Sequence, residues 1–192
     1  MDLNALLNQA TGFLEGEMKR LGVDCERDVE PSLFVLGDKE LLYRAIYNVL
    51  VNAYQAIERD GTIRVYGRRR DDGMAELSFH DSGPGFPPDL LPKLLDPFFT
   101  TKDHGTGLGL PIVNTIITAH NGRLLLTNPE GGGAMITMLL PLADFPGEPG
   151  DAPSEEADAP LTLTDALPQD GGKPGRGDAS GRPPHASHKD TI

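Results

Sequence analysis

Two glycine-rich clusters, at residues 81–86 and 105–110, constrain the fold of this chain more than any other part of its sequence. Glycine tolerates positive φ angles and lets the backbone come close to a ligand. The connector between the clusters, residues 87–104, contains several prolines and shows little helical or strand periodicity. Long connections without secondary structure in a compact domain are usually functional lids or disordered segments. We therefore expect a loop that closes over a ligand from both ends.

The segment before these clusters carries the strongest helix prediction in the chain. Across residues 40–58, one broad apolar face is formed at helical spacing by Leu41, Leu42, Ala45, Ile46, Val49, Leu50, Ala53 and Ile57. Asp38 stands where the N-cap of this helix is expected. Asn48 and Asn52 lie four residues apart and project from one side of the helix, close to its apolar face. Asparagine is unfavourable in a helix interior, so the pair either bridges a neighbouring loop or serves a ligand.

The rest of the ordered sequence alternates between helical and strand patterns. The spacing predicts further helices over residues 2–21 and 107–120, and strands over residues 23–29, 33–36, 62–70, 74–80, 123–127 and 134–140. A tight turn at residues 71–73 is expected to pair two of these strands as a hairpin. This hairpin delivers Asp81 to the first glycine cluster at the end of a strand. The sequence therefore predicts an α/β domain over residues 1–142.

The composition separates a tail from this domain. Proline, glycine, alanine, aspartate and serine dominate residues 143–192, which are predicted to be disordered because they cannot bury enough apolar surface. The formal net charge of -12 argues against nucleic acid as a partner. The single cysteine, Cys25, fits a reducing compartment, and no apolar run is long enough for a membrane helix. We expect a cytoplasmic domain without membrane contact, which leaves open a membrane anchor elsewhere in the full-length protein.

These elements bring together the groups that a nucleotide site needs. Asp81 can accept a hydrogen bond from an exocyclic amine such as N6 of adenine. The amide oxygen of Asn52 suits Mg²⁺, which takes one or two protein oxygens together with substrate phosphates, and Asn48 lies one turn away. An anion site at a helix start is expected from the backbone N–H groups of Gly105, Gly107 and Leu108. The P-loop and dinucleotide fingerprints are absent, so spacing alone does not identify the nucleotide as ATP.

Four short motifs occur in an order that resembles the ATP-binding catalytic domain of sensor histidine kinases. They are residues 48–53 (NVLVNA), 81–85 (DSGPG), 97–102 (PFFTTK) and 105–110 (GTGLGL), and they are similar to the N, G1, F and G2 boxes of that family. The wider superfamily includes DNA gyrase, chaperone ATPases and the mismatch-repair MutL proteins. Residues 52–56 and the complete F box are most similar to the nitrogen-regulation (NtrB-like) branch of these kinases.

The resemblance implies a Bergerat fold, a two-layer α/β sandwich in which three helices cover one face of a mixed sheet beneath an ATP lid. It implies that Asn52 holds Mg²⁺ and that Asp81 reads adenine. The base pocket would be shaped by Gly83 and Gly85. The lid would hinge and meet the phosphates at Gly105, Gly107 and Gly109. The implied nucleotide contacts are completed by Phe86, Thr101, Lys102, Thr106 and Leu108. Asn48 and Lys102 are the implied catalytic residues, with Lys102 approaching the triphosphate.

The resemblance also implies a reaction, the transfer of the γ-phosphoryl group of ATP to a protein histidine. Asn48 cannot act as the general base that a glutamate provides in hydrolytic members, which fits phosphoryl transfer rather than vigorous hydrolysis. No helical His-Glu or His-Asp motif contains any of the five histidines, His80, His104, His120, His185 and His188. We therefore expect the acceptor histidine on a dimerisation domain absent from this chain, a response regulator downstream, and a monomeric fragment.

Three other functions are open at this point. A conformational ATPase resembling gyrase, chaperone or MutL domains would favour a glutamate at position 48 and a long domain after the last strand. A serine kinase that acts on an anti-sigma antagonist shares the fold, but the complete F box argues against it. A degenerate nucleotide sensor would be recognised by its failure to bind an ATP analogue, and the complete motifs argue against it.

Overall fold

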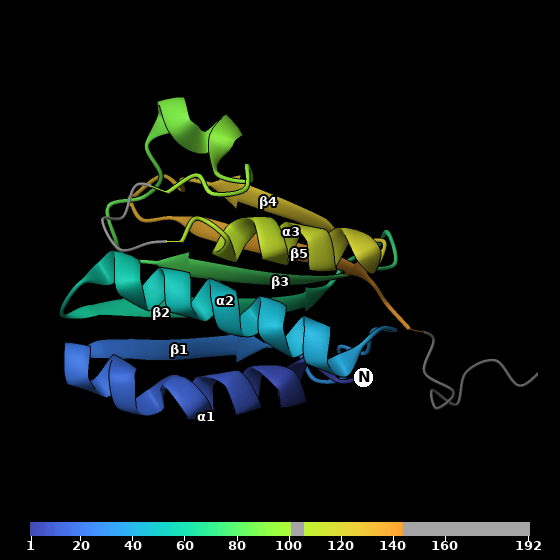
Figure 1. The fold of residues 1–192 in the computed structure, drawn as a ribbon. Coiled ribbons are helices and arrows are strands. Elements are labelled where there is room, and N and C mark those ends of the chain that lie inside the picture. Colours follow the sequence, from blue (N-terminus) through green and yellow to red (C-terminus); the bar gives the residue numbers. More distant parts are fainter. Residues whose placement is uncertain (101–105, 144–192) are drawn as a thin grey trace, which may run out of the picture. The chain divides into compact units, whose positions relative to one another are not determined.

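The computed structural model describes residues 1–100 and 106–143. In these residues the helices are α1 (Leu3–Leu21), α2 (Lys39–Ile57), the 3-10 helix η1 (Pro88–Lys93) and α3 (Gly109–Ala119). The strands are β1 (Val23–Val29), β2 (Gly61–Arg69), β3 (Met74–Asp81), β4 (Arg123–Thr127) and β5 (Met135–Pro141) (Figure 1). The predicted tail, residues 143–192, lies outside the described residues except for Ala143.

Local capping explains where the two long helices begin. Asp2 caps α1 by accepting a hydrogen bond from the backbone N–H of Asn4, and the helix ends at Gly22, whose φ of 68° is left-handed. Asp38 caps α2 by accepting from the N–H groups of Glu40 and Leu41. The sequence-based assignment of Asp38 as an N-cap is therefore confirmed. No helix among the described residues combines the length and the apolar character needed to cross a membrane.

The strands form one mixed sheet in the order β1-β2-β3-β5-β4. β1 and β2 run parallel, and the other neighbouring pairs are antiparallel. The predicted hairpin is present, with Val65 on β2 opposite Phe79 on β3. The strand predicted at residues 33–36 is wrong, because this segment makes only isolated bridges, Asp2 with Phe34 and Val35 with Leu142. The segment follows Pro31 and the left-handed Ser32, and it crosses the end of the domain without running alongside another strand.

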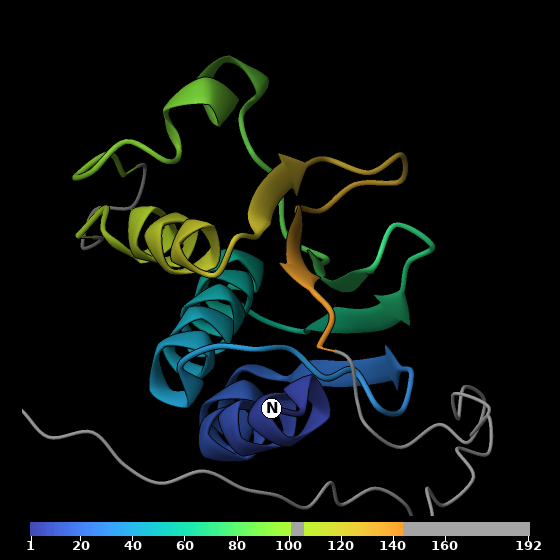
Figure 2. The ribbon, with the colours of Figure 1, turned by 90° about the vertical axis from the view of Figure 1, so that its right-hand side faces the viewer.

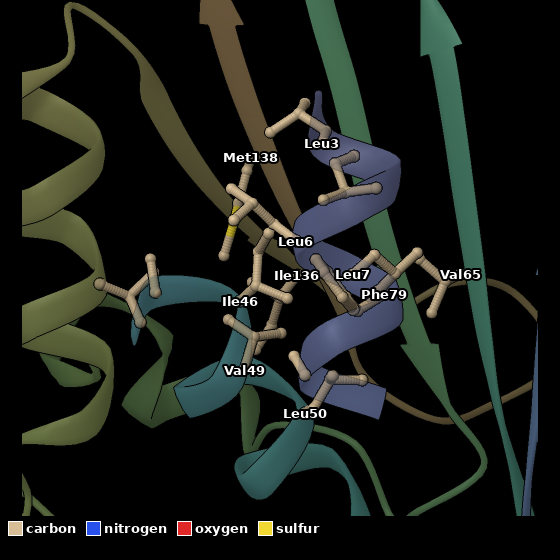
Figure 3. Close-up of a cluster of buried hydrophobic side chains, with 14 of the residues drawn as sticks. Leu3, Leu6, Leu7, Ile46, Val49, Leu50, Val65, Phe79, Ile136 and Met138 are labelled. Atoms are coloured by element: carbon tan, nitrogen blue, oxygen red, sulfur yellow. The ribbon is translucent and has the colours of Figure 1, made fainter. Parts of the chain in front are cut away.

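The three α-helices pack on one face of this sheet (Figure 2). Their apolar faces meet the inward-facing side chains of the strands in a single core, and Figure 3 shows its centre, with Leu3, Leu6 and Leu7 of α1 beside Ile46, Val49 and Leu50 of α2. From the sheet, Val65, Phe79 and Met138 complete this centre. Burial of these apolar side chains is the main force that holds the two layers together. The predicted two-layer α/β sandwich is confirmed.

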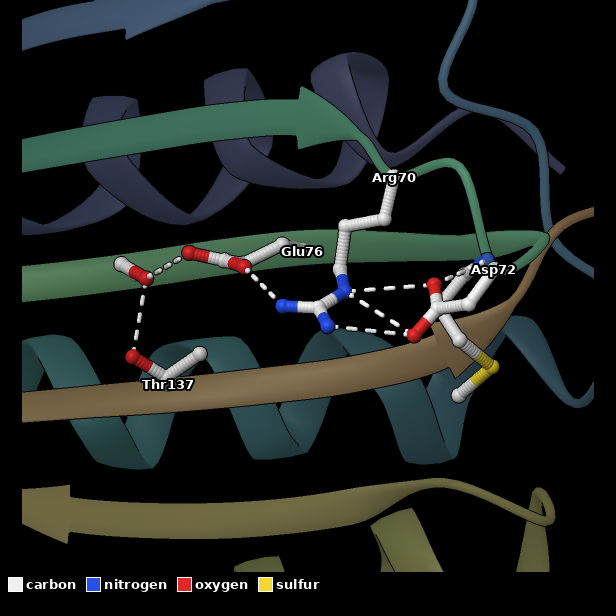
Figure 4. A network of polar contacts seen from close by, with 6 residues as sticks. Arg70, Asp72, Glu76 and Thr137 are labelled. Atoms are coloured by element: carbon white, nitrogen blue, oxygen red, sulfur yellow. Dashed lines mark hydrogen bonds and ion pairs between the residues drawn. The ribbon is translucent and has the colours of Figure 1, made fainter.

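The opposite face of the sheet carries polar side chains, as the alternation of a strand requires. Arg70 binds Asp72 at 3.1 Å and Glu76 at 3.0 Å, and the chain of contacts continues through Ser78 to Thr137 (Figure 4). The hydrogen bonds from the Arg70 guanidinium, with a smaller effect of its charge, hold the pKa of Asp72 below its ordinary value. This polar network lies on the face away from the helices, where Arg70 and Asp72 are exposed and Ser78 and Thr137 are buried.

Candidate functional site

A cavity of about 610 Å³ lies between α2, the end of β3, the first glycine cluster and the start of α3. Eight of the predicted site residues line it, namely Asn48, Asn52, Asp81, Gly85, Phe86, Thr106, Gly107 and Gly109. The fold therefore brings together one helix face, one strand end and one helix start that are far apart in the sequence. Asp81 and Ile136 line it from the sheet, and Leu94, Phe99 and Thr100 line it from the connector.

Asp81 is the last residue of β3 and is almost completely buried, with 4% of its surface exposed. Its backbone N–H donates to the carbonyl of Ala134 at 3.0 Å, which ties it to the chain just before β5. Its Oδ1 accepts from the N–H of Gly83 at 2.9 Å and from that of Ala134 at 3.4 Å. A buried carboxylate needs such donors to offset its desolvation. Asp81 is therefore fixed at the wall of the cavity by strands that belong to the core.

The two glycines after Asp81 are required by close backbone packing. A Cβ at Gly83 would lie 2.8 Å from Oδ1 of Asp81 and 3.0 Å from the carbonyl oxygen of Ala56. Gly85 has a φ of 80°, and a Cβ there would lie 2.9 Å from the carbonyl oxygen of Gly133. The chain can therefore turn tightly between α2 and the residues before β5 only because both positions lack a side chain. Gly83 itself is not among the described residues that line the cavity.

Asn48 and Asn52 occupy the same face of α2, as their spacing predicted, and both are half-buried against the cavity. The start of α3 comes very close to Asn52, since a Cβ at Gly109 would lie 3.3 Å from its Nδ2. Glycine at position 109 therefore allows the helix start to approach the amide. Both asparagines line the cavity, which is where a ligand role would require them, and Asn52 also lies beside the start of α3.

The helix expected from residue 107 begins at Gly109 instead. Gly107 takes a left-handed φ of 64°, and its carbonyl accepts the N–H of Phe98 at 3.1 Å, so it cannot join the helix. Leu108 is the N-cap residue and makes no capping bond through its side chain. Leu108 is not among the described lining residues, although Gly107 and Gly109 on either side of it are. The first turn of α3 thus begins at the cavity without a side-chain cap, an arrangement suited to an anion.

The connector was predicted to lack secondary structure, and this is wrong for residues 88–93, which form η1. Prolines set the φ angle that a 3-10 turn needs, and the N–H of Leu90 donates to the carbonyl of Pro87 at 2.9 Å. None of the residues of η1 is buried. Three residues of the predicted site, Thr101, Lys102 and Gly105, lie outside the described residues.

Comparison with known proteins identifies the family. The model of the family of histidine kinase-, DNA gyrase B- and HSP90-like ATPases matches residues 37–144, a span that includes α2, the first glycine cluster, α3 and the last two strands. The chain belongs to this ATPase family.

Sensor histidine kinases are its relatives within the ATPase family. The chain is 36% identical over 143 residues to the signal transduction histidine-protein kinase AtoS of Escherichia coli, covering 74% of this chain and 24% of that protein. It is 35% identical over 159 residues to the nitrogen regulation protein NtrY of Azorhizobium caulinodans, covering 79% of this chain and 20% of NtrY. The chain thus spans a quarter or less of the length of these two relatives.

Solved structures support the same assignment. The mycobacterial sensor histidine kinase MprB superimposes with a TM-score of 0.66 at 32% identity, and the match covers 74% of this chain and 95% of that one. The catalytic domain of the histidine kinase ThkA superimposes with a TM-score of 0.68 at 29% identity, covering 74% and 93%. The fold and the family resemblance predicted from the four motifs are therefore confirmed.

The oxygen donors that line the cavity decide whether Mg²⁺ fits there. No group of three or more His, Cys, Asp or Glu side chains that could hold a metal ion occurs in residues 1–100 and 106–143. The asparagine amides of α2 are the oxygen donors beside the helix start, and Mg²⁺ commonly takes one or two protein oxygens with the rest from phosphates and water. The residues therefore fit a Mg²⁺ ion that arrives with a nucleotide.

Several lining residues were missed by the sequence analysis. Val51, Gln55 and Ala56 line the cavity, and they lie three, seven and eight residues after Asn48, so helical spacing from the asparagine pair points to them. Ile136 on β5 also lines the cavity, and only the strand order brings it there. The local sequence contains a signal for the first group and none for Ile136.

Proposed function

We propose that this chain is the catalytic domain of a two-component sensor histidine kinase, which binds ATP with Mg²⁺ and transfers the γ-phosphoryl group to a histidine on a dimerisation domain. One observation carries the proposal: Asp81, the asparagine pair of α2 and the uncapped start of α3 line one cavity of about 610 Å³. The membership of the ATPase family and the similarity to sensor histidine kinases support it.

The base is recognised at the strand side of the cavity. Asp81 accepts a hydrogen bond from the N6 amine of adenine, while its Oδ1 also accepts the N–H groups of Gly83 and Ala134. Guanine carries a carbonyl oxygen at the corresponding position and would face the buried carboxylate with another acceptor. Because the unmade bond would leave a buried charge facing an acceptor, the site discriminates against guanine.

The phosphates are bound at the opposite side, between α2 and α3. The backbone N–H groups in the first turn of α3 stabilise the negative charge of the triphosphate. Asn52 would supply an oxygen ligand to a Mg²⁺ ion, and the bound ion would offset the negative charge of the phosphates. The motif resemblance also implies phosphate-binding roles for Thr101, Lys102 and Gly105, which lie outside the described residues.

Asn48 orients the reacting end without acting as a base. A side-chain amide does not take up a proton near neutral pH, so Asn48 cannot activate water in the way a carboxylate does. The acceptor histidine brings its own nucleophilic ring nitrogen, which forms the new N–P bond as the bond to the β-phosphate oxygen breaks and ADP leaves. Positioning and charge stabilisation are then the main contributions of this domain.

The test is a transfer reaction with the chain itself. We expect that labelled ATP, Mg²⁺ and the dimerisation domain of the matching kinase will give an acid-labile phosphohistidine on that domain. The Asn52→Ala variant should transfer much less under the same conditions. Acid-stable phosphoserine would favour the serine kinase, and rapid ATP hydrolysis without transfer would favour a conformational ATPase. Binding of ATP without transfer to any matching domain would contradict the proposal.

We propose a cytoplasmic location for this domain and a response regulator as the downstream acceptor of the phosphoryl group. We expect the isolated chain to be a monomer. Sedimentation at several concentrations checks the last point, since a concentration-dependent mass would contradict it.

A further inference from the structure

We propose that Asn128, which lies outside the four motifs, is a positioning residue of the base pocket. It begins the β4–β5 connection, defined here as residues 128–134. Its side-chain Oδ1 accepts the backbone N–H of Phe86 at 2.8 Å, and its Nδ2 donates to the carbonyl of Phe86 at 2.7 Å. The side-chain amide of Asn128 therefore binds both the N–H and the carbonyl of Phe86. The inference rests on the nucleotide site proposed above.

Phe86 is the residue through which this contact reaches the pocket. Phe86 lines the cavity and Asn128 is not among the described residues that do. The preceding residue, Gly85, is also pressed against the connection, because a Cβ there would lie 3.1 Å from Oδ1 of Asn128 and 2.9 Å from the carbonyl oxygen of Gly133. Asn128 therefore fixes the position of the turn that follows Asp81.

The β4–β5 connection is itself anchored to the sheet. His80 on β3 donates from Nε2 to the carbonyl of Gly132 at 3.0 Å. Two hydrogen bonds join Ala134 to Asp81, one in each direction. A Cβ at Gly133 would lie only 1.9 Å from the carbonyl oxygen of Asp81, so the connection and the strand end are in direct backbone contact. The β4–β5 connection therefore binds Asp81 through Ala134, and it binds Phe86 through Asn128.

The pair of hydrogen bonds between Asn128 and Phe86, here called the clasp, requires a side-chain amide. Phe86 presents one donor and one acceptor, and among side chains of this size only asparagine offers the complementary pair in one planar group. Aspartate can accept from the N–H of Phe86, but it places a negative charge beside the carbonyl oxygen. Alanine makes neither bond. The clasp is exposed to solvent, so water competes for both groups and the effect of its removal will be moderate.

The experiment measures ADP affinity by calorimetry in Mg²⁺ for the full chain and three variants. Asn128→Ala is expected to raise Kd three- to tenfold, on the order of one or two lost hydrogen bonds. Asn128→Asp is expected to weaken binding as well, although it preserves the side-chain shape. Glu130→Ala, an exposed position in the same connection, is the matched control and is expected to leave Kd unchanged. The melting temperature without nucleotide is measured for every variant.

The outcomes separate this inference from the proposed function. A lower melting temperature for Asn128→Ala with an unchanged Kd would overturn the inference and leave the proposed function intact. Equal losses of affinity in Asn128→Ala and Glu130→Ala would also overturn it, because any change in the connection would then have the same effect. Failure of the wild-type chain to bind ADP would overturn the proposed function and the inference together.

Discussion

The two sides of the cavity are built in different ways. On the base side, Asp81 is 4% exposed and is held by β3, by the residue before β5 and by the turn that Asn128 clasps. On the connector side, η1 has no buried residue and Phe98 is 76% exposed at a φ of 68°. The base side is therefore part of the core, whereas the described part of the connector, residues 87–100, depends on local backbone contacts.

If the cavity binds a nucleotide as proposed, this difference separates two tasks of the site. A base pocket that discriminates between purines needs its acceptor fixed before the ligand arrives, since an adjustable acceptor would adapt to the wrong base. Elements with few buried apolar contacts open at low free energy and are the ones that move during binding. We expect changes on the base side to alter stability and affinity together, and changes on the connector side to leave global stability nearly unchanged.

Gly133→Ala tests the base side with the largest expected effect. The new Cβ would lie 1.9 Å from a strand carbonyl, and the φ of 81° already disfavours alanine. Strain and overpacking together should lower the free energy of unfolding by about 3 kcal/mol. The control is Gly131→Ala, with a φ of 108° and no atom within 4 Å, which should lose only about 1 kcal/mol. Equal losses in a urea titration would show that the contact with Asp81 does not matter.

Asp81→Asn tests recognition of the base. Asparagine has one acceptor oxygen where aspartate has two, and Oδ1 of Asp81 already accepts two backbone N–H groups. Loss of a hydrogen bond to a charged acceptor should weaken ADP binding by about 2 kcal/mol, or about thirtyfold. The control is Asp71→Asn, which removes the same negative charge at an exposed position in the β2–β3 turn. An unchanged affinity with a lower melting temperature would assign Asp81 a purely structural role.

Asn52→Ala tests the phosphate side through the metal. Removal of one oxygen ligand should weaken ADP binding about tenfold in Mg²⁺, since loss of a charged contact is worth about 1.4 kcal/mol or more. The same comparison in EDTA is the control, and there the two proteins should bind alike. A loss of the same size with and without Mg²⁺ would assign Asn52 to the nucleotide itself.

Gly107→Ala tests the connector side with the smallest expected effect on stability. Its Cβ would lie 2.5 Å from the carbonyl carbon of Phe98, a clash of the same kind as at Gly133. Because this segment buries little, it can rearrange without unfolding the core, and the unfolding free energy should change by less than about 1 kcal/mol. A loss as large as that of Gly133→Ala would remove the distinction between the two sides.

Much of this fold could be predicted because local signals agree with the tertiary structure. Asp38 caps α2 as expected, and the apolar face around Val49 and Leu50 is buried in the core. The pair Asn48 and Asn52 was singled out because asparagine is unfavourable in a helix interior, and the structure places both residues beside the cavity. Their binding of a ligand stays a prediction.

The features that were missed depend on contacts between distant segments. The sequence around Asn128 reads as an ordinary strand connection, and its role depends on Phe86 lying beside it. Helix α3 begins at Gly109 and not at the predicted residue 107, because the carbonyl of Gly107 accepts a hydrogen bond from the N–H of Phe98. The strand predicted at residues 33–36 has β-compatible residues, but it lacks a neighbour along its length. In each case the local pattern was compatible with two structures, and tertiary contacts determined which one forms.

Amide chemical shifts during a titration with an ATP analogue and Mg²⁺ test the central claim most directly. The account predicts saturable shifts at Phe86 and Leu110, which line the cavity, and at Gly83, whose N–H donates to Oδ1 of Asp81. It predicts no shift at Glu76 on the outer face of the sheet. Two results would contradict the placement of the nucleotide between α2, β3 and α3. One is saturable shifts at other amides with none at these three, and the other is no saturable shift at all.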